Sequence, residues 1–348
     1  MYMKTTNLIK ALFLLLLLTL SSCIPTEKEL SVLQFNIWQE GTVIENGFDA
    51  IVDNIIHVNP DLVTFSEVRN YNNVDFIDHL IAELEKKGST YYGEASESTG
   101  IISKYPIVEQ TVIYPYVNDQ GSILKAVIEI ENNTVALYSA HLDYKHYACY
   151  LPRGYSGETW QKLELPITNP DSILAANRKS KRLEAIERFI IDAKNEIQKE
   201  HIVILGGDLN EPSHLDWQEE TKNLWDHNGA VVNWDCSMVL YNNGFKDSYR
   251  EIYPDAVNYP GFTFPSDNLD VPISKLTWAP DADERERIDF IYYYPHQNIS
   301  LEDVIIVGPS SSIVRSEREV EQSKDKFILP PSTWPTDHKA VLSKFKIK

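Results

Sequence analysis

The sequence predicts an α+β fold in which β-sheets pack on each other and helices lie outside them. Segments with the alternating pattern of strands and segments with the apolar stripe of amphipathic helices interleave along the chain. Many of the strand segments nevertheless follow one another, which disfavours a purely parallel, doubly wound sheet. A hydrophobic fraction of 43% is enough for a sizeable core.

The first residues have the features of a secretory signal. Lys4 and Lys10 precede an apolar run from Ala11 to Leu20. This run is shorter than the ~20 residues needed to cross a bilayer. Small residues then precede Cys23, an arrangement that resembles a bacterial lipoprotein signal. The resemblance implies that residues 1–22 are removed, that Cys23 is acylated, and that the exported chain is anchored to a bacterial membrane, on its periplasmic or cell-surface face. An ordinary cleaved signal is the alternative.

The remaining chain is predicted to form one domain. Residues 23–30 would be a short tether and residues 31–348 the domain, because there is no internal repeat, low-complexity tract or clear linker. We expect a monomer. The formal charge of −19 becomes about −21 once the two lysines of the signal leave, and such a surface repels polyanions. This charge weighs against nucleic acid as a partner.

Six segments have strand character and carry polar residues at or next to an end. In residues 31–38, Leu33, Phe35 and Ile37 share one face and Gln34 and Asn36 the other. The others are 61–68 with Glu67, 134–140 before His141, 201–205 before Asp208 and Asn210, 288–294 with Asp289, and 340–347 after Asp337 and His338. We expect helices at 47–58, 75–87 and 177–199, where apolar residues recur at helical spacing.

These polar strand ends predict a metal-dependent site. A buried carboxylate without a partner is costly, so acidic residues are unusual in strands of a core. If the strand ends converge, their oxygen atoms suit Mg²⁺ or Mn²⁺, and the two histidines can handle protons and charge. Each residue alone has an ordinary explanation: Asp337-His338 as a solvated turn, Glu67 as a surface charge, His141 as a packed histidine. The number of coincidences carries the prediction.

Six motifs resemble, in order, those of the endonuclease/exonuclease/phosphatase superfamily. They are Gln34-Phe35-Asn36-Ile37-Trp38, the stretch from Pro60 to Val68, Ser139-Ala140-His141-Leu142-Asp143, Gly207-Asp208-Leu209-Asn210, Arg287-Ile288-Asp289-Phe290-Ile291 and Thr336-Asp337-His338. The resemblance spans residues 32 to 347. It implies a four-layer α/β/β/α sandwich of two mainly antiparallel sheets, with the site where both sheets open.

The resemblance also implies a metal-dependent phosphoric ester hydrolase. Glu67 resembles the principal metal ligand, with Asn36 and Asp337 beside it. Asp208 resembles the residue that activates or orients the attacking water, and Asn210 the residue that holds a phosphate oxygen. This chemistry is intelligible from the residue types, because a metal can neutralise a phosphate oxygen while a carboxylate prepares water for in-line attack.

The two histidines have separate roles by the same resemblance. His338 resembles the histidine that stabilises charge on the phosphoryl group, and Asp289 the carboxylate that orients it. His141 resembles the second histidine of the nuclease, sphingomyelinase and phosphatase branches. A histidine held by a carboxylate keeps its orientation and gains positive character.

An aromatic-rich insertion from Asp143 to about Thr168 follows the His141 motif and matches no family element. Loops beside a rigid site commonly set specificity, so several of its residues are candidates for substrate contact: Lys145, His146, Arg153, Tyr155 and Trp160. Arg178, predicted at the start of the long helix, could face a phosphate. The alternatives are a loop that packs its own aromatics and, for Arg178, a solvated face.

The sequence therefore favours hydrolysis of a small, sugar- or lipid-derived phosphate ester, a diester or a monoester, by in-line water attack. One alternative is a nonspecific secreted nuclease. Another is a lipoprotein that binds a phosphorylated ligand without turnover, although no expected catalytic position is replaced. Cys149 and Cys236 could form a disulfide or remain two buried thiols.

Overall fold

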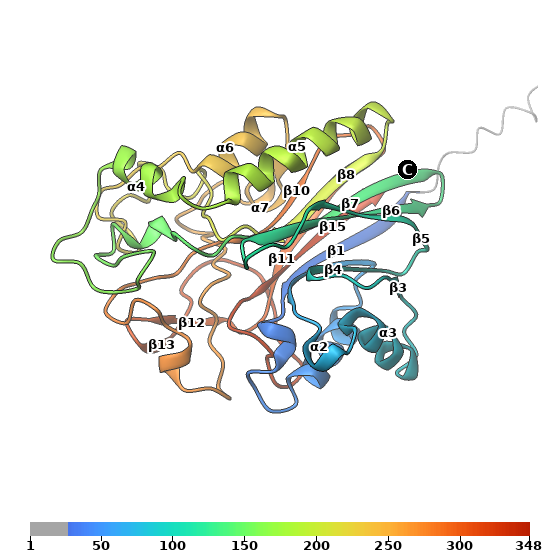
Figure 1. The fold of residues 1–348 in the computed structure, drawn as a ribbon, viewed down its shortest axis with the longest axis horizontal. Helices are drawn as coiled ribbons and strands as arrows, with labels where there is room; N and C mark the ends of the chain where they lie inside the picture. The colour runs from blue at the N-terminus through green and yellow to red at the C-terminus, as the bar shows by residue number, and fades with distance from the viewer. Residues whose placement is uncertain (1–26) are drawn as a thin grey trace, which may run out of the picture.

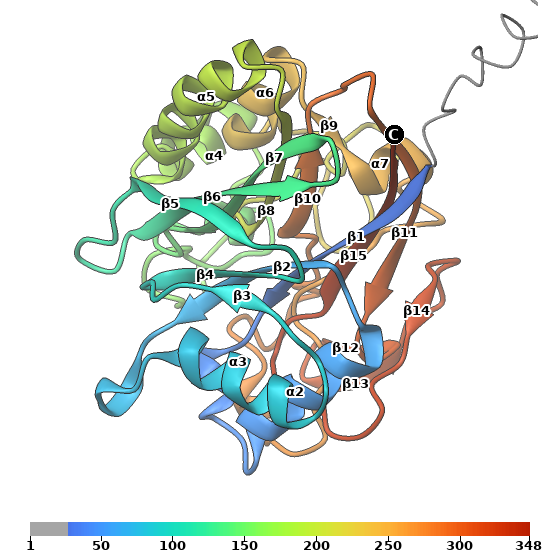
Figure 2. The same ribbon diagram turned by 90° about the vertical axis from the view of Figure 1, so that its right-hand side faces the viewer.

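The computed structural model describes residues 27–348, so Cys23 and the predicted signal lie outside the described residues. Two large sheets lie face to face, and helices cover both outer faces (Figures 1 and 2). This arrangement confirms the predicted α/β/β/α sandwich. Within residues 27–348, no helix is both long enough and apolar enough to cross a membrane.

The first sheet has seven strands in the order β14-β11-β15-β1-β2-β4-β3. Their bounds are β1 (Lys28–Asn36), β2 (Leu62–Val68), β3 (Tyr92–Gly93), β4 (Ser98–Ser103), β11 (Ile299–Val307), β14 (Phe327–Ile328) and β15 (Ala340–Ile347). Neighbours are antiparallel except β1 with β2 and β11 with β14. The parallel pair β1 and β2 brings two carboxyl ends, and thus Asn36 and Glu67, to the same edge of the sheet.

The second sheet has six strands in the order β5-β6-β7-β8-β10-β9. They are β5 (Ile107–Tyr114), β6 (Gly121–Ile130), β7 (Asn133–Leu142), β8 (Ile202–Asp208), β9 (Lys246–Asp247) and β10 (Asp289–Tyr293). Only β7 and β8 are parallel, so His141 and Asp208 are register partners at their carboxyl ends. A separate ribbon consists of β12 (Ser311–Val314) and β13 (Glu317–Val320).

Helices and sheets enclose three apolar layers. Helices α2 (Gly47–Val58) and α3 (Phe76–Lys86) pack on the first sheet, and α5 (Arg182–Gln198) and α6 (Asp235–Asn242) pack on the second. The third layer lies between the sheets, where Val32 and Ile101 meet Leu137 and Ile204. Burial of each such side chain contributes roughly 1.5–3 kcal/mol. Two short helices are α4 (Pro170–Asn177) and α7 (Ser248–Ile252).

The predicted helix 177–199 is observed as α5, which begins five residues later than predicted because the chain turns between α4 and α5. Asn177 donates to Glu211 Oε2 at 2.5 Å and accepts from Arg182 Nη2 at 2.6 Å. Ser180 Oγ also donates to the Asn177 carbonyl oxygen, at 2.8 Å. Asparagine and serine side chains that bond nearby groups compete with the helical pattern, and here they end one helix before the next begins.

Two glycines allow β8 to approach its neighbours closely. A Cβ atom at Gly206 would lie 2.3 Å from Thr64 Oγ1 of the facing sheet, and one at Gly207 would lie 2.6 Å from the Cβ of Ala140. Any side chain at these two positions would push the strands apart. The close approach brings Asp208, the next residue, to the opening between the sheets. Elsewhere in the described chain, Cys149 and Cys236 are both buried free thiols.

Candidate active site

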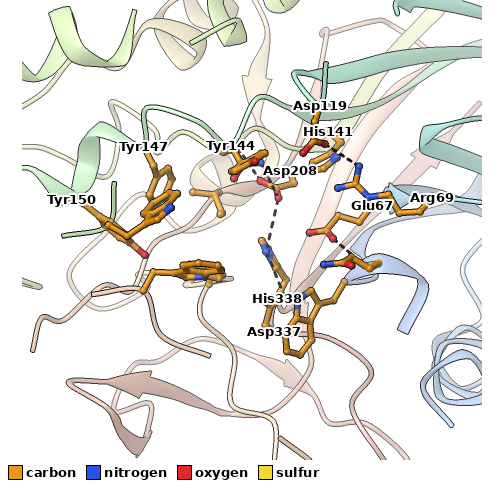
Figure 3. Close-up of a pocket in the computed structure, with 17 residues that line it drawn as sticks. Glu67, Arg69, Asp119, His141, Tyr144, Tyr147, Tyr150, Asp208, Asp337 and His338 are labelled. Carbon is orange, nitrogen blue, oxygen red and sulfur yellow. Dashed lines mark hydrogen bonds and ion pairs between the residues drawn. The ribbon is translucent and has the colours of Figure 1, made fainter. Parts of the chain in front are cut away.

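The polar strand ends predicted from the sequence meet where the two sheets open (Figure 3). The amide of Asn36 is the clearest evidence. Its Nδ2 donates to Asp208 Oδ2 at 2.9 Å and lies 3.3 Å from Glu67 Oε1. The same atom lies 3.4 Å from His338 Nε2. One amide group therefore contacts side chains from three other segments that are far apart in the sequence.

Glu67 stands on a distortion of β2. The register between β2 and β4 shifts between Ser66 and Val68, and Glu67 has a φ of 71°. A left-handed conformation is uncommon for a residue with a side chain, and bulges of this kind occur near active sites because they redirect a side chain. The Gln39 N–H donates to Glu67 Oε2 at 2.9 Å. The bulge and this bond direct the carboxylate toward the cavity between the sheets.

His338 is held by Asp289 from the facing sheet. Its Nδ1 lies 2.8 Å from Asp289 Oδ2, and its ring centroid lies 5.0 Å from that of Phe264. Burial alone would lower the pKa of His338, but the charge of Asp289 and the hydrogen bond outweigh burial and raise it to about 10. His338 is therefore a fixed cation whose Nε2 lies 3.9 Å from Asp208 Oδ2 and 4.0 Å from Asp337 Oδ1.

Asp208 is a buried carboxylate with ordered partners. Besides Asn36, it accepts a hydrogen bond from the Asn210 N–H at 2.8 Å. Burial and the charge of Asp289 raise the pKa of Asp208 to about 7, although His338 opposes the shift. A carboxylate in such surroundings can take a proton from water near neutral pH.

Asn210 and His141 complete the polar side of the site. Asn210 Nδ2 donates to the Leu142 carbonyl oxygen at 3.0 Å and lies 3.5 Å from Asp208, which leaves its second hydrogen weakly engaged. His141 Nδ1 lies 3.2 Å from Ser98 Oγ. Burial and the nearby Arg69 lower the pKa of His141 to about 3, so this histidine is neutral.

Glu67 and Asp337 are candidate ligands for a divalent cation. Burial and the negative charge of Glu67 raise the pKa of Asp337 to about 7, although His338 lowers it. Two neighbouring carboxylates that repel each other are the oxygen donors that Mg²⁺ and Mn²⁺ prefer. Asn36 Oδ1 accepts the Trp38 N–H at 3.0 Å, and its Nδ2 faces Asp208 and Glu67.

A second group of ligand-type side chains lies nearby. Asp208, Asp289 and His338 are buried, and one ligand atom of each lies within 4.8 Å of the others. Asp289 and His338 are already hydrogen-bonded to each other through Oδ2 and Nδ1. These three residues and the pair Glu67 and Asp337 are two candidate positions for a cation.

Comparison with known proteins agrees with this geometry. The model of the endonuclease/exonuclease/phosphatase family matches residues 33–338. The chain belongs to this family. Family members hydrolyse phosphate esters, so membership supports a hydrolase, and the buried acidic residues with His338 form a possible metal site.

Individual relatives cover almost the whole chain. An uncharacterized protein of Caenorhabditis elegans, F14F9.5, is 27% identical over 97% of this chain and 99% of its own length. Among solved structures, an endonuclease/exonuclease/phosphatase from Bacteroides vulgatus has a TM-score of 0.52 at 13% identity, covering 92% of this chain and all of that chain. D. rerio TDP2 in complex with a single-strand DNA product has a TM-score of 0.50 at 15% identity, covering 91% of this chain and 99% of that chain. These two likenesses show the fold.

The active-site cavity of this family member has a volume of about 290 Å³. Arg69 and Asp119 line its polar side together with Gln39, Glu67, His141, Asp208, Asn210, Asp337 and His338. Its other side is mostly aromatic, with Tyr144, Tyr147, Tyr150, Trp160, Phe264 and Trp278. Figure 3 shows Tyr147 and Tyr150 on one side of Asp208 and His338, and Glu67 and Arg69 on the other.

Of the substrate contacts predicted in the insertion, only Trp160 lines the cavity. Arg153 is a correction: its side chain is buried and donates to Glu286 Oε1 at 2.7 Å and to three carbonyl oxygens. Tyr155 is buried too, and its hydroxyl accepts the Asp281 N–H at 3.2 Å. Both side chains stabilise the loops instead of facing the substrate.

The remaining three predicted contacts also lie outside the cavity lining. Lys145 Nζ donates to the Asn118 carbonyl oxygen at 2.9 Å. His146 Nδ1 lies 3.6 Å from Glu158 Oε2. Arg178 is exposed at the end of α4, not at the start of the long helix, and forms two hydrogen bonds with Asp235. The helix break explains this last error.

Sequence reasoning missed Arg69, which lines the cavity beside Glu67. Its Nη1 donates to the Tyr116 hydroxyl at 2.7 Å and to Asp119 Oδ1 at 3.1 Å. No hydrogen bond within residues 27–348 uses its Nε or Nη2. The position two residues after Glu67 was a usable signal for Arg69, whereas nothing in the sequence pattern marked Trp278.

Proposed function

We propose that this chain hydrolyses a small phosphate ester, a diester or a monoester, with Mg²⁺ or Mn²⁺ held by Glu67 and Asp337. The observation that carries the proposal is the meeting of Asn36, Asp208 and His338, from three distant segments, beside these two carboxylates. The bound metal would neutralise a phosphate oxygen and so lower the barrier to attack. The role of Asn36 as a direct metal ligand stays a prediction.

Asp208 is the residue that prepares water. It accepts the water proton while the water oxygen bonds to phosphorus and the ester P–O bond breaks on the opposite side. The departing oxygen takes up a proton from solvent. The Asn36 and Asn210 hydrogen bonds fix the Asp208 carboxylate, so little reorganisation is needed during the reaction.

His338 and Asn210 contact the phosphoryl oxygens. The positive charge of His338, maintained by Asp289, opposes the negative charge that develops on these oxygens. Asn210 supplies its weakly engaged amide hydrogen. The neutral His141, bonded through Nδ1 to Ser98, has Nε2 available as a further donor or acceptor.

The cavity supports a small substrate. A volume of about 290 Å³ is at the lower end of the range for small-molecule sites. The formal charge of −19 disfavours the phosphate backbone of a long nucleic acid. We therefore propose a small substrate over a nuclease function, and a monomer as the working form.

The test is metal-dependent release of p-nitrophenol from bis-p-nitrophenyl phosphate. We expect hydrolysis with Mg²⁺ or Mn²⁺, loss in EDTA, and loss in Asp208→Asn but not in the control Asp53→Asn, which lies on α2. Plasmid DNA is the competing substrate. Degradation of DNA with comparable efficiency would favour a nuclease, and inactivity across a broad panel of esters would favour a binding protein.

We also propose that Cys23 anchors the exported protein. This rests on the sequence alone, because Cys23 lies outside the described residues. Cells grown with radiolabelled palmitate should label the wild-type chain and not Cys23→Ala. If both forms are labelled equally, or if neither form is labelled, the proposed lipid anchor on Cys23 is contradicted. The proposed catalysis is not affected by that result.

A further inference from the structure

The aromatic side of the cavity has no role in the chemistry described so far. We call Tyr147, Tyr150, Trp160, Phe264 and Trp278 the aromatic wall. Three separate segments supply it, and Phe264 joins it to the catalytic centre because its ring lies 5.0 Å from the His338 ring. The wall is thus continuous with the place where phosphorus would lie.

The rings of the aromatic wall form a packed series. Ring centroids lie 4.9 Å apart for Tyr147 and Tyr150, 5.7 Å for Tyr150 and Trp160, and 5.4 Å for Trp160 and Trp278. The series runs from buried tyrosines to Trp278, which is 50% exposed. An indole left half in water at the rim of a cavity gains free energy when a ligand covers it.

A buried carboxylate fixes this wall before any ligand arrives. Glu284 is 1% exposed. It accepts hydrogen bonds from the Tyr150 hydroxyl at 2.5 Å and from the backbone N–H of Trp278 at 3.1 Å. It therefore joins the insertion to the loop that carries Trp278. Trp160 has a φ of 60°, a conformation that the surrounding structure must impose on a bulky residue. Such preorganisation reduces the cost of binding.

The wall offers few polar partners. The charged residues of the cavity lining, Glu67, Arg69, Asp119, Asp208, Asp337 and His338, belong to the catalytic side. Glu284 is buried behind the wall. Its Oε2 accepts the hydrogen bonds above, and its Oε1 accepts one from Thr277 Oγ1. A sugar would leave most of its hydroxyl groups without partners here. A flat apolar ring has no such requirement, and its face can lie against an indole ring.

We propose that the aromatic wall binds a flat apolar ring on the substrate, so that the preferred substrates are phosphate esters whose esterified group carries an aryl ring. This inference rests on the proposed phosphoesterase function, because the phosphate of such a substrate must lie at Asp208 and His338. The ring then lies against Trp160 and Trp278 while phosphorus stays within reach of the polar side.

The test measures binding, not turnover. Isothermal titration of the purified protein in Mg²⁺ with phenylphosphonate, cyclohexylphosphonate and methylphosphonate compares a flat ring, a puckered ring and no ring. We expect phenylphosphonate to bind at least tenfold more tightly than methylphosphonate and more tightly than cyclohexylphosphonate. Trp278→Ala should remove most of the phenyl preference, Trp278→Phe should keep it, and Tyr92→Ala on β3 is the control.

Each contrary result has one meaning. Equal affinity for phenyl- and methylphosphonate overturns the inference, and so does equal affinity for phenyl- and cyclohexylphosphonate. A phenyl preference that survives both Trp278→Ala and Trp160→Leu places the ring elsewhere and also overturns it. If the wild-type protein hydrolyses bis-p-nitrophenyl phosphate in these cases, the proposed function stands. If it binds no phosphonate and hydrolyses no ester, the proposed function and the inference fail together.

Discussion

Glu67 and Asp337 show how single residues of this site trade stability for chemistry. Glu67 adopts a left-handed backbone conformation, and Asp337 is buried with a pKa raised to about 7 by burial and by the charge of Glu67. Both features oppose folding in the absence of a cation. Active sites often keep such unfavourable arrangements because function requires them.

Replacing Asp337 should therefore stabilise the metal-free protein. We expect Asp337→Asn to raise the free energy of unfolding in EDTA by about 1 kcal/mol, because it removes a buried charge next to Glu67. Mg²⁺ should raise the melting temperature of the wild-type protein and not that of the variant. Thermal unfolding with and without Mg²⁺ checks both, with Asp53→Asn as the control. A variant destabilised in EDTA would contradict the account.

His338 and Asp289 should act as one unit. His338→Gln removes the cation that faces the phosphoryl oxygens, and we expect kcat to fall by roughly 10²–10³. Asp289→Asn keeps a polar neighbour for His338 but removes the charge that raises the pKa of His338. We therefore expect kcat to fall in this variant as well. Steady-state kinetics on bis-p-nitrophenyl phosphate measure kcat for both variants. His57→Gln, exposed on α2, should leave kcat unchanged.

The sequence predicted which polar strand ends meet better than it predicted which loop residues line the cavity. Asn36, Glu67 and Asp208 lie at strand ends, and the order of the strands limits where those ends can meet. Arg153 was misassigned because its type suits an anion equally well as a structural ion pair, and only the position of Glu286 decides between them. The partners of a loop residue depend on the folded path of the chain.

At the scale of elements, the helix bounds were predicted best where packing and local signals agree. The range 47–58 is the observed α2, and Pro60 ends it as expected. The break between α4 and α5 could not be predicted, because it depends on hydrogen bonds with Glu211, far along the chain. Arg182 is 1% exposed at the first turn of α5.

Arg182 holds the insertion to α5. Its Nη1 donates to the carbonyl oxygens of Asp143 and Lys145, and its Nη2 to that of His146, at 2.6, 2.8 and 2.9 Å. Lysine cannot reproduce this fork, so we expect Arg182→Lys to lower the free energy of unfolding by about 2–4 kcal/mol.

The same substitution should expose residues 143–168 to trypsin. Urea denaturation measures the stability change, and mass spectrometry of tryptic fragments locates the cleavage. Arg188→Lys, on the exposed face of the same helix, is the matched control. Equal stability and equal protease resistance of the two variants would show that Arg182 does not position the insertion.

At the scale of the whole molecule, the two-sheet sandwich followed from consecutive strands, but several strands were not predicted. Strands β5 and β6 lie between the predicted segments, and β5 exposes many residues, so its sequence lacks a clear buried face. Short strands such as β9 and β14 are defined by their pairing and not by their own pattern.

The acid stability of the molecule should depend on Glu196, which joins α5 to the second sheet. Burial would raise the pKa of Glu196, but hydrogen bonds from Lys125, Lys199 and His201 outweigh it and lower the pKa to about 2. Because the folded-state pKa is depressed, the stabilisation is complete above about pH 4.5 and disappears as the pH falls toward 2.

Glu196→Gln should lower the free energy of unfolding at pH 7 by about 1–3 kcal/mol and make it less dependent on pH between 5 and 3. Urea denaturation at pH 7, 5 and 3.5 checks this, with the exposed Glu85→Gln as the control. Parallel pH profiles for wild type and Glu196→Gln would mean that the ion pairs do not link helix and sheet energetically.

The most direct test of the site is a crystal structure of the protein with Mn²⁺ and phenylphosphonate, using anomalous scattering to locate the ion. We predict one Mn²⁺ bound by the carboxylates of Glu67 and Asp337, with the phosphonate between the ion and His338. An ion bound instead by Asp208, Asp289 and His338, or a phosphonate bound away from Asp208, would contradict the account.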